Sequence, residues 1–158
     1  MTFDYAADVA EHKKAVGSLL RFIVRDLEAR AAVHDDSKLD PEEMSVYERV
    51  IPEIKTAPFG SDAYKAGLVS LGPALDRHYA INRHHPEHFG PSDGKPGGIP
   101  AMALSDIVEM LCDWVASAEA KGNDPVKGMV EFQFPKYGVD GDLQAILLNT
   151  VRELRNGR

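Results

Sequence analysis

The sequence predicts an all-α protein: a single compact helical domain of about six helices over residues 1–158. Apolar residues recur at helical steps along most of the chain, no segment alternates as a half-buried strand does, and turn residues separate the periodic segments. With 158 residues and 44% hydrophobic composition, the chain is long enough for one full core and short for two.

Residues 4–33 form the first predicted helix, in one piece or in two. Its stripe consists of Val9, Val16, Leu19, Leu20, Ile23 and Leu27. His12 and His34 fall on the same stripe. Along a straight helix these two imidazoles would stand about 33 Å apart. They can therefore ligate one ion together only if the helix breaks near residues 23–26.

The second predicted helix begins at Asp40-Pro41, with Asp40 as N-cap and Pro41 as first residue. Glu43 follows at the third position, from which its side chain can reach back to the cap. This helix should end by Pro52, because proline cannot donate a backbone hydrogen bond.

The third predicted helix starts at Ser61 and has the clearest seam in the chain. Steps of four and three residues connect Tyr64, Leu68, Leu71, Leu75, His78, Asn82 and His85. Gly72-Pro73 should kink it. After Leu75 the inward positions are polar, and burying such groups costs free energy unless they are paired or bound.

The second half of the chain starts with a loop at residues 86–100, which holds four prolines. A long helix should follow at residues 101–121, with Leu104, Ile107, Leu111, Trp114 and Ala118 on its core face. Asp106, Glu109 and Asp113 lie on an adjoining strip and are neighbours in space. A short helix from Val126, an aromatic patch at residues 132–137 and a last amphipathic helix at residues 140–155 complete the chain.

Composition limits the partners and the location. A net charge of -7 argues against an extended nucleic-acid surface, which needs clustered basic residues. The single cysteine, Cys112, cannot form a disulfide within the chain, which fits a reducing compartment. The start has no signal-peptide layout, and no apolar run is long enough to span a bilayer. We therefore expect a cytoplasmic protein, and a homo-oligomer stays open.

Three clusters of metal-ligating residue types stand out. They are His34-Asp35-Asp36-Ser37-Lys38, Asn82-Arg83-His84-His85-Pro86-Glu87-His88, and the acidic strip on the helix at residues 101–121. Five of the six histidines fall in or beside the first two. An imidazole next to a carboxylate can ligate a divalent cation when further ligands arrive from elsewhere in the fold. The clusters together predict a metal centre.

The first two clusters also carry a resemblance to known families. His34-Asp35-Asp36-Ser37-Lys38 resembles the His-Asp-x-x-Lys signature of the HD-domain metal-dependent phosphohydrolases, and His84-His85-Pro86-Glu87-His88 resembles their downstream histidine cluster. Together with Asp-x-x-Glu-Met-Leu-Cys-Asp-Trp, these motifs are more closely similar to a small family of unknown function common in phage genomes.

The HD resemblance implies an HD-domain-like fold and a bound divalent ion, which can be Mn, Fe, Co, Zn or Mg. His34 and Asp35 would ligate it, with His12 as the early histidine. Asp106 or Asp113 would be the late aspartate, and Asp106 is preferred.

The downstream histidines have roles in the same resemblance. His84, His85 and His88 would ligate a second ion or donate a proton to the leaving oxygen. Glu109 and Lys38 join His88 as catalytic candidates.

The activity that this resemblance implies is metal-dependent hydrolysis of a nucleotide or another small phosphorylated metabolite. Lys38, Arg77 and Arg83 would hold phosphate oxygens, and His78 and Asn82 would add contacts to the substrate. Two alternatives stay open: an HD-type di-iron oxygenase, and a non-catalytic, metal-stabilised module that binds a nucleotide or a protein partner.

Overall fold

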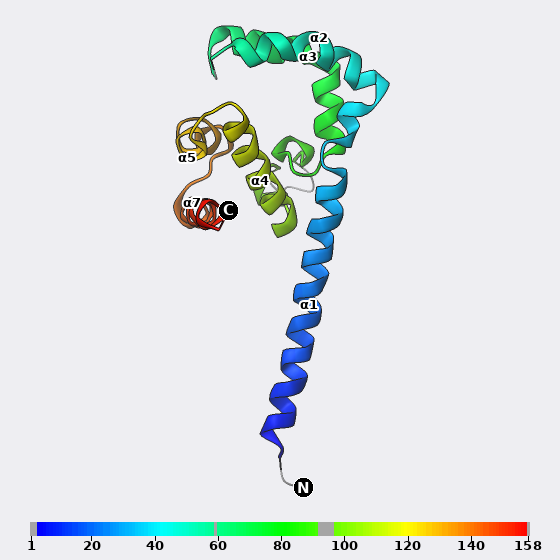
Figure 1. Ribbon diagram of the computed structural model, residues 1–158, viewed down its shortest axis with the longest axis vertical. Helices are drawn as coiled ribbons and strands as arrows, with labels where there is room; N and C mark the ends of the chain where they lie inside the picture. The colour runs from blue at the N-terminus through cyan, green and yellow to red at the C-terminus, as the bar shows by residue number, and fades with distance from the viewer. Residues whose placement is uncertain (1–2, 59, 92–96, 158) are drawn as a thin grey trace. The chain divides into compact units, whose positions relative to one another are not determined.

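Helices account for the regular structure of the chain. The computed structural model describes residues 3–58, 60–91 and 97–157, and all the regular elements in these residues are helical (Figure 1). This confirms the all-α prediction. No helix in the described part of the chain combines the length and apolar composition needed to cross a bilayer. Residues 92–96 of the predicted loop lie outside the described residues.

The chain divides into two units, Met1–His34 and Asp35–Arg158. The first unit is helix α1 (Tyr5–Val33), whose N-cap Asp4 accepts a hydrogen bond from the backbone N–H of Ala7 at 3.1 Å. The second unit holds every described helix after α1.

Helix α1 is a single helix, a point that the sequence left open. It continues without a break through residues 23–26, the place where a bend would have been needed. His12 and His34 are therefore about 33 Å apart along the helix. The condition under which His12 could share an ion with His34 is not met, and His12 leaves the candidate site.

Helix α2 (Pro41–Thr56) follows the short 3-10 helix η1 (Asp36–Leu39). It begins at Pro41 as predicted but continues beyond Pro52, where the sequence predicted its end. Proline deprives the carbonyl of Glu48 of its helical donor. Glu48 lies on the exposed face of α2, where water can take the place of that donor.

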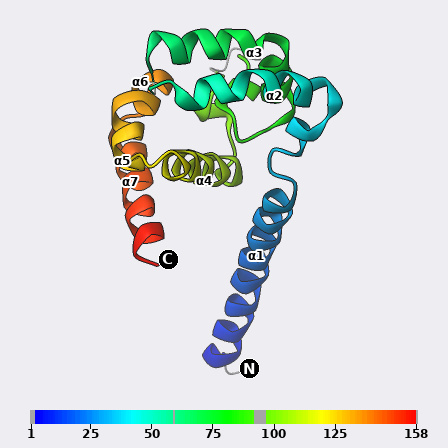
Figure 2. The ribbon, with the colours of Figure 1, turned by 45° about the horizontal axis from the view of Figure 1, so that its top comes forward.

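Helix α3 (Asp62–Ile81) lies beside α2 (Figure 2). Ser61 caps it as predicted, accepting a hydrogen bond from the Tyr64 N–H at 3.2 Å. The predicted kink is present at Gly72, whose φ of 42° and ψ of -125° are non-helical. At Gly67, a Cβ atom would come within 2.5 Å of the Ile54 side chain. The two helices therefore pack closely, and every described residue of the predicted seam is buried or half-buried.

The remaining elements surround an apolar core. They are η2 (Pro86–His88), η3 (Ile99–Ala101), α4 (Leu104–Ala120), α5 (Pro125–Gly128), the π-helical turn η4 (Met129–Gln133), α6 (Phe134–Tyr137) and α7 (Gly141–Asn156). Met110, Leu111, Trp114 and Val151 are among its buried residues. Leu104, predicted on the core face of α4, is instead 68% exposed at the first position of the helix.

Candidate metal centre

Asp35 lies in a tight turn that starts the second unit. Its φ of 62° is left-handed, a conformation that aspartate tolerates better than most residues. The turn closes with a hydrogen bond from the Lys38 N–H to the Asp35 carbonyl at 2.9 Å, and the Lys38 ammonium pairs with Asp35 Oδ2. The other carboxylate oxygen, Oδ1, lies 3.2 Å from His78 Nε2 and 3.5 Å from His84 Nε2.

This carboxylate is ionised. Burial alone would raise the pKa of Asp35, but the interactions of its carboxylate with His78, His84 and Lys38 outweigh burial and hold the pKa well below its usual range. Asp35 Oδ1 is thus an anionic oxygen directed at two imidazoles.

His78 on α3 is 1% exposed and is oriented through its other nitrogen. Nδ1 lies 3.0 Å from Ser37 Oγ and 3.5 Å from Glu43 Oε2. The Asn82 amide donates to Ser37 Oγ and to the His78 carbonyl, each at 2.9 Å. These two hydrogen bonds use both protons of the Asn82 amide. The His78 Nδ1–H can therefore donate to Ser37 Oγ, and the Ser37 hydroxyl donates to Glu43. The Nε2 lone pair then faces Asp35.

His84 is arranged in the same way. Its Nδ1 lies 3.2 Å from Glu109 Oε1, and its Nε2 points toward Asp35 Oδ1. A carboxylate on the far nitrogen of an imidazole fixes the tautomer and increases the basicity of the near nitrogen, as is usual behind metal-binding histidines. Both buried histidines have this support, from Glu43 on α2 and from Glu109 on α4.

His85 completes the group. Its Nε2 lies 2.9 Å from His78 Nε2. Burial, together with the neighbouring imidazoles of His84 and His78, lowers the pKa of His85 to about 3, so its imidazole is neutral at pH 7. We call Asp35, His78, His84 and His85 the four-ligand cluster, since each offers one ligand atom and these atoms lie within 4.8 Å of one another.

The donor set suits a transition-metal ion. Two atoms bound to one ion at about 2.1 Å stand about 3.0 to 3.4 Å apart in octahedral or tetrahedral geometry. The 2.9 and 3.2 Å separations from His78 Nε2 and the 3.5 Å separation from His84 Nε2 are close to this range. Three imidazoles with one carboxylate favour Zn, Fe, Co or Mn over Mg, which prefers oxygen ligands.

Tyr47 on α2 adds an unsatisfied hydroxyl beside the cluster. Its ring stands 6.3 Å from the ring of His78, and its buried hydroxyl makes no hydrogen bond within the described part of the chain. Burial, with the negative charges of Glu43 and Asp35, raises the pKa of Tyr47, so the phenol keeps its proton. A water or a substrate oxygen at the cluster could accept from this donor.

Asp106, the preferred late aspartate, has another use. It is fully buried and receives two hydrogen bonds from the Arg83 guanidinium, at 3.1 and 2.9 Å, while the Ala103 N–H donates to it at 2.8 Å. These contacts pair Arg83 and cap the start of α4. Asp106 therefore belongs to a structural ion pair, outside the four-ligand cluster.

The two predicted phosphate-binding arginines are both paired with carboxylates. Arg83 binds Asp106, and Arg77 binds Asp40, Glu42 and Glu43 at 2.9, 3.2 and 2.7 Å. Hydrogen bonds to Asp40 and Glu43 raise the pKa of Arg77. The Asp40 side chain thus binds Arg77 rather than capping α2, and Glu43 does not reach back to the cap.

The other predicted residues take separate places. His88 Nδ1 lies 3.3 Å from the Tyr79 carbonyl, which puts this histidine outside the cluster. Asp113 accepts from Ser117 Oγ at 3.2 Å and lines a neighbouring pocket. Glu109 Oε1 lies 3.2 Å from His84 Nδ1, where it can orient that ring, and its catalytic role stays a prediction. His34 caps the end of α1 in the first unit, and its role as a ligand stays a prediction.

Sequence reasoning missed Ser37 and Glu43 and gave His78 a different role. The seam through His78, Asn82 and His85 was the available signal, because it put three polar residues on the face that packs inward.

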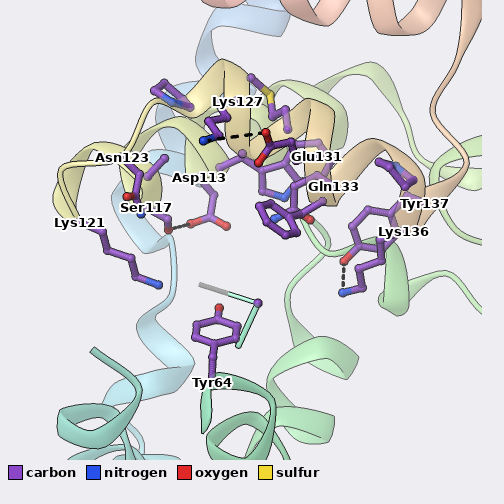
Figure 3. Close-up of a pocket in the computed structure, with 18 of the residues that line it drawn as sticks. Tyr64, Asp113, Ser117, Lys121, Asn123, Lys127, Glu131, Gln133, Lys136 and Tyr137 are labelled. Carbon is purple, nitrogen blue, oxygen red and sulfur yellow. Dashed lines mark hydrogen bonds and ion pairs between the residues drawn. The ribbon is translucent and has the colours of Figure 1, made fainter. Parts of the chain in front are cut away.

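The second unit contains a pocket of about 940 Å³ (Figure 3). His85 is in the lining, so this residue connects the pocket to the four-ligand cluster. Side chains of α3, α4, α5, η4 and α6 form the remaining walls.

Comparison with known proteins identifies the family. Residues 1–153 match a family of unknown function (DUF5662), and the chain belongs to that family. Neither the curated proteins nor the solved structures give a match to the chain.

Proposed function

We propose that the chain is a metal-dependent phosphohydrolase of the HD type that acts on a nucleotide or another small phosphorylated metabolite. The observation that carries the proposal is the convergence of three imidazole nitrogens and one carboxylate oxygen, with the far nitrogens of His78 and His84 held by carboxylates. Nothing in ordinary core packing requires this arrangement, and burying it has a desolvation cost that a bound cation would offset.

When bound, a divalent ion would polarise a phosphoryl oxygen and lower the pKa of a bound water. The protein's own groups would do the rest. Asp35 would supply the anionic ligand, while Lys38, paired to Asp35 Oδ2, would keep that carboxylate oriented. The Tyr47 hydroxyl would donate a hydrogen bond to an oxygen at the cluster.

The test begins with metal content. Purified protein should contain or take up about one equivalent of Mn²⁺, Co²⁺, Fe²⁺ or Zn²⁺, and His78→Ala and His84→Ala should lose it. His88→Ala is the matched control, because His88 lies in the same histidine-rich segment but outside the cluster, and it should keep the metal. Full retention of metal in both cluster variants would rule out the proposed centre.

Activity is tested separately on a panel of nucleoside mono-, di- and triphosphates and sugar phosphates, with phosphate release as the readout. Metal-dependent release that disappears in His84→Ala supports a hydrolase. Bound metal without turnover on the panel would contradict it and favour a binding module. An iron-dependent absorption band that changes with oxygen would favour an oxygenase.

A further inference from the structure

The pocket beside His85 has aromatic walls. Tyr64 points into it from α3, across from Asp113 and Ser117 on α4 and from Lys121, which follows α4 (Figure 3). The Lys121 ammonium stands 5.2 Å from the centre of the Tyr64 ring. Trp114 and Tyr137 also line the pocket, and their rings stack in parallel on each other, with ring centres 5.8 Å apart and planes 9° apart. Flat apolar surfaces of this kind favour a planar aromatic ligand.

The charge of the pocket differs from that of the whole chain. The protein has a net charge of -7, but four lysines and three carboxylates line the pocket in the described residues: Lys65, Lys121, Lys127, Lys136, Asp113, Asp124 and Glu131. The lining is thus slightly positive on a strongly negative protein. An anionic ligand is attracted to this pocket more than to the remaining surface.

One end of the pocket lies next to the four-ligand cluster. His85 contributes to both, and Glu87, two residues later, holds the Lys136 ammonium at 2.8 Å and accepts from the Tyr137 hydroxyl at 2.8 Å. An ammonium group is therefore fixed near the end of the pocket that His85 lines. A phosphate at that end would face both Lys136 and the cluster.

We propose that this pocket binds a nucleoside 5′-phosphate, with the base between the aromatic side chains and the phosphate at the His85 end. The inference rests on the proposed function only for the hydrolysis of the phosphate; binding of the nucleotide does not depend on it. The base stacks on Tyr64, and the Ser117 hydroxyl and the side-chain amides of Asn123 and Gln133 offer hydrogen bonds to its edge. About 940 Å³ is within the usual range for a ligand of this size.

Binding can be measured without turnover. Adenosine 5′-monophosphate and uridine 5′-monophosphate are titrated into the full chain in the presence of a chelator, by calorimetry and by the fluorescence of Trp114, the single tryptophan of the chain. Both nucleotides should bind at least tenfold more tightly than ribose 5-phosphate, which has no base to stack. Equal affinity for ribose 5-phosphate would overturn the inference.

Variants at Tyr64 test the stacking contact. Tyr64→Ala should weaken nucleotide binding about tenfold or more and leave the affinity for ribose 5-phosphate unchanged, while Tyr64→Phe should keep most of the nucleotide affinity. If Tyr64→Ala does not fold, Tyr64→Leu keeps an apolar contact without the aromatic face. Unchanged nucleotide affinity in the folded variant would overturn the inference.

The two proposals fail in different ways. If Tyr64 variants weaken nucleotide binding but no metal-dependent phosphate release occurs, the hydrolase proposal is wrong and the nucleotide-binding pocket is supported. If phosphate is released from sugar phosphates and nucleotides at the same rate, and Tyr64 variants have no effect, the nucleotide-binding pocket is wrong and the hydrolase proposal is supported.

Discussion

The two halves of the second unit bury different kinds of groups. Between η1, α2 and α3, the buried residues include Ser37, Glu43 and His78 beside a small apolar cluster of Val50, Ile54 and Leu71. In the half formed by α4 to α7, most of the buried residues are apolar: Met110, Leu111, Trp114, Val115, Met129, Phe134, Val139, Leu147 and Val151.

The α4 to α7 half contributes mainly stability, whereas the η1, α2 and α3 half holds polar groups of the candidate metal centre. Apolar burial stabilises the α4 to α7 half without any ligand. The η1, α2 and α3 half has to satisfy a buried carboxylate and a buried imidazole, so it depends on each hydrogen bond and, in our proposal, on an ion. Substitutions in the two halves should therefore differ in whether metal changes their effect.

The largest effect is expected for Glu43→Ala. Glu43 is fully buried and connects Arg77 to Ser37 and His78, so its removal takes one of three carboxylates from Arg77 and leaves the buried Ser37 and His78 without theirs. The free energy of unfolding, measured by urea denaturation, should fall by about 3 to 5 kcal/mol. Glu42→Ala is the matched control. Glu42 also pairs with Arg77 but is 79% exposed, so the loss should stay below about 1 kcal/mol. If Glu43→Ala and Glu42→Ala lowered the free energy of unfolding equally, burial of the carboxylate would not explain the effect.

Leu147→Ala probes the apolar half. Leu147 is 3% exposed on α7, and truncating it should lower the free energy of unfolding by about 2 to 5 kcal/mol through lost burial and the cavity that remains. The loss should be the same with and without metal. Ile146→Ala, next to it and 59% exposed, should change stability by no more than about 0.5 kcal/mol. A metal-dependent loss in Leu147→Ala would show that the halves are coupled.

Metal itself should stabilise the polar half. At a free concentration one hundred times its Kd, a bound ion adds about 2.7 kcal/mol to the free energy of unfolding. Thermal unfolding of the chelator-treated protein, repeated with Mn²⁺, Co²⁺ or Zn²⁺, measures this gain. The shift should be present in wild type and in Leu147→Ala and absent in His84→Ala. The same shift in His84→Ala would place the ion elsewhere.

The smallest effect is expected for Glu109→Gln. This change keeps the size of the side chain but removes the negative charge behind His84 Nδ1. Metal affinity should fall about tenfold, equivalent to about 1.4 kcal/mol, with little change in stability. Glu119→Gln, on the exposed side of the same helix, should leave metal affinity unchanged. Unaltered affinity in Glu109→Gln would mean that the carboxylate does not tune the histidine.

Local features of the fold could be predicted from the sequence because they depend on near neighbours. The α3 seam, its Ser61 cap and its kink at Gly72 follow from spacing and turn chemistry alone. The extension of α2 past Pro52 could not be predicted, since it depends on which face of the helix meets water.

The candidate site was only partly predictable for a similar reason. Asp35, His84 and His85 were recognised from short motifs. The role of His78 depends on Ser37, 41 residues away, and that of Glu43 depends on Arg77, 34 residues away. One sequence gives no measure of such long-range pairing, so Glu43 was assigned to the nearest local role, a helix cap.

Gly72 connects these features mechanically. Tyr64 of the pocket and His78 of the cluster belong to the same helix, on opposite sides of the one non-helical residue that α3 contains in its described interior. A side chain at Gly72 would meet no atom within 4 Å, so only its backbone geometry excludes other residues. In our proposals, the backbone angles at Gly72 would therefore help to set the distance between the bound base and the bound ion. If the proposals hold, a substitution at Gly72 should change this distance, although Gly72 belongs neither to the pocket lining nor to the cluster.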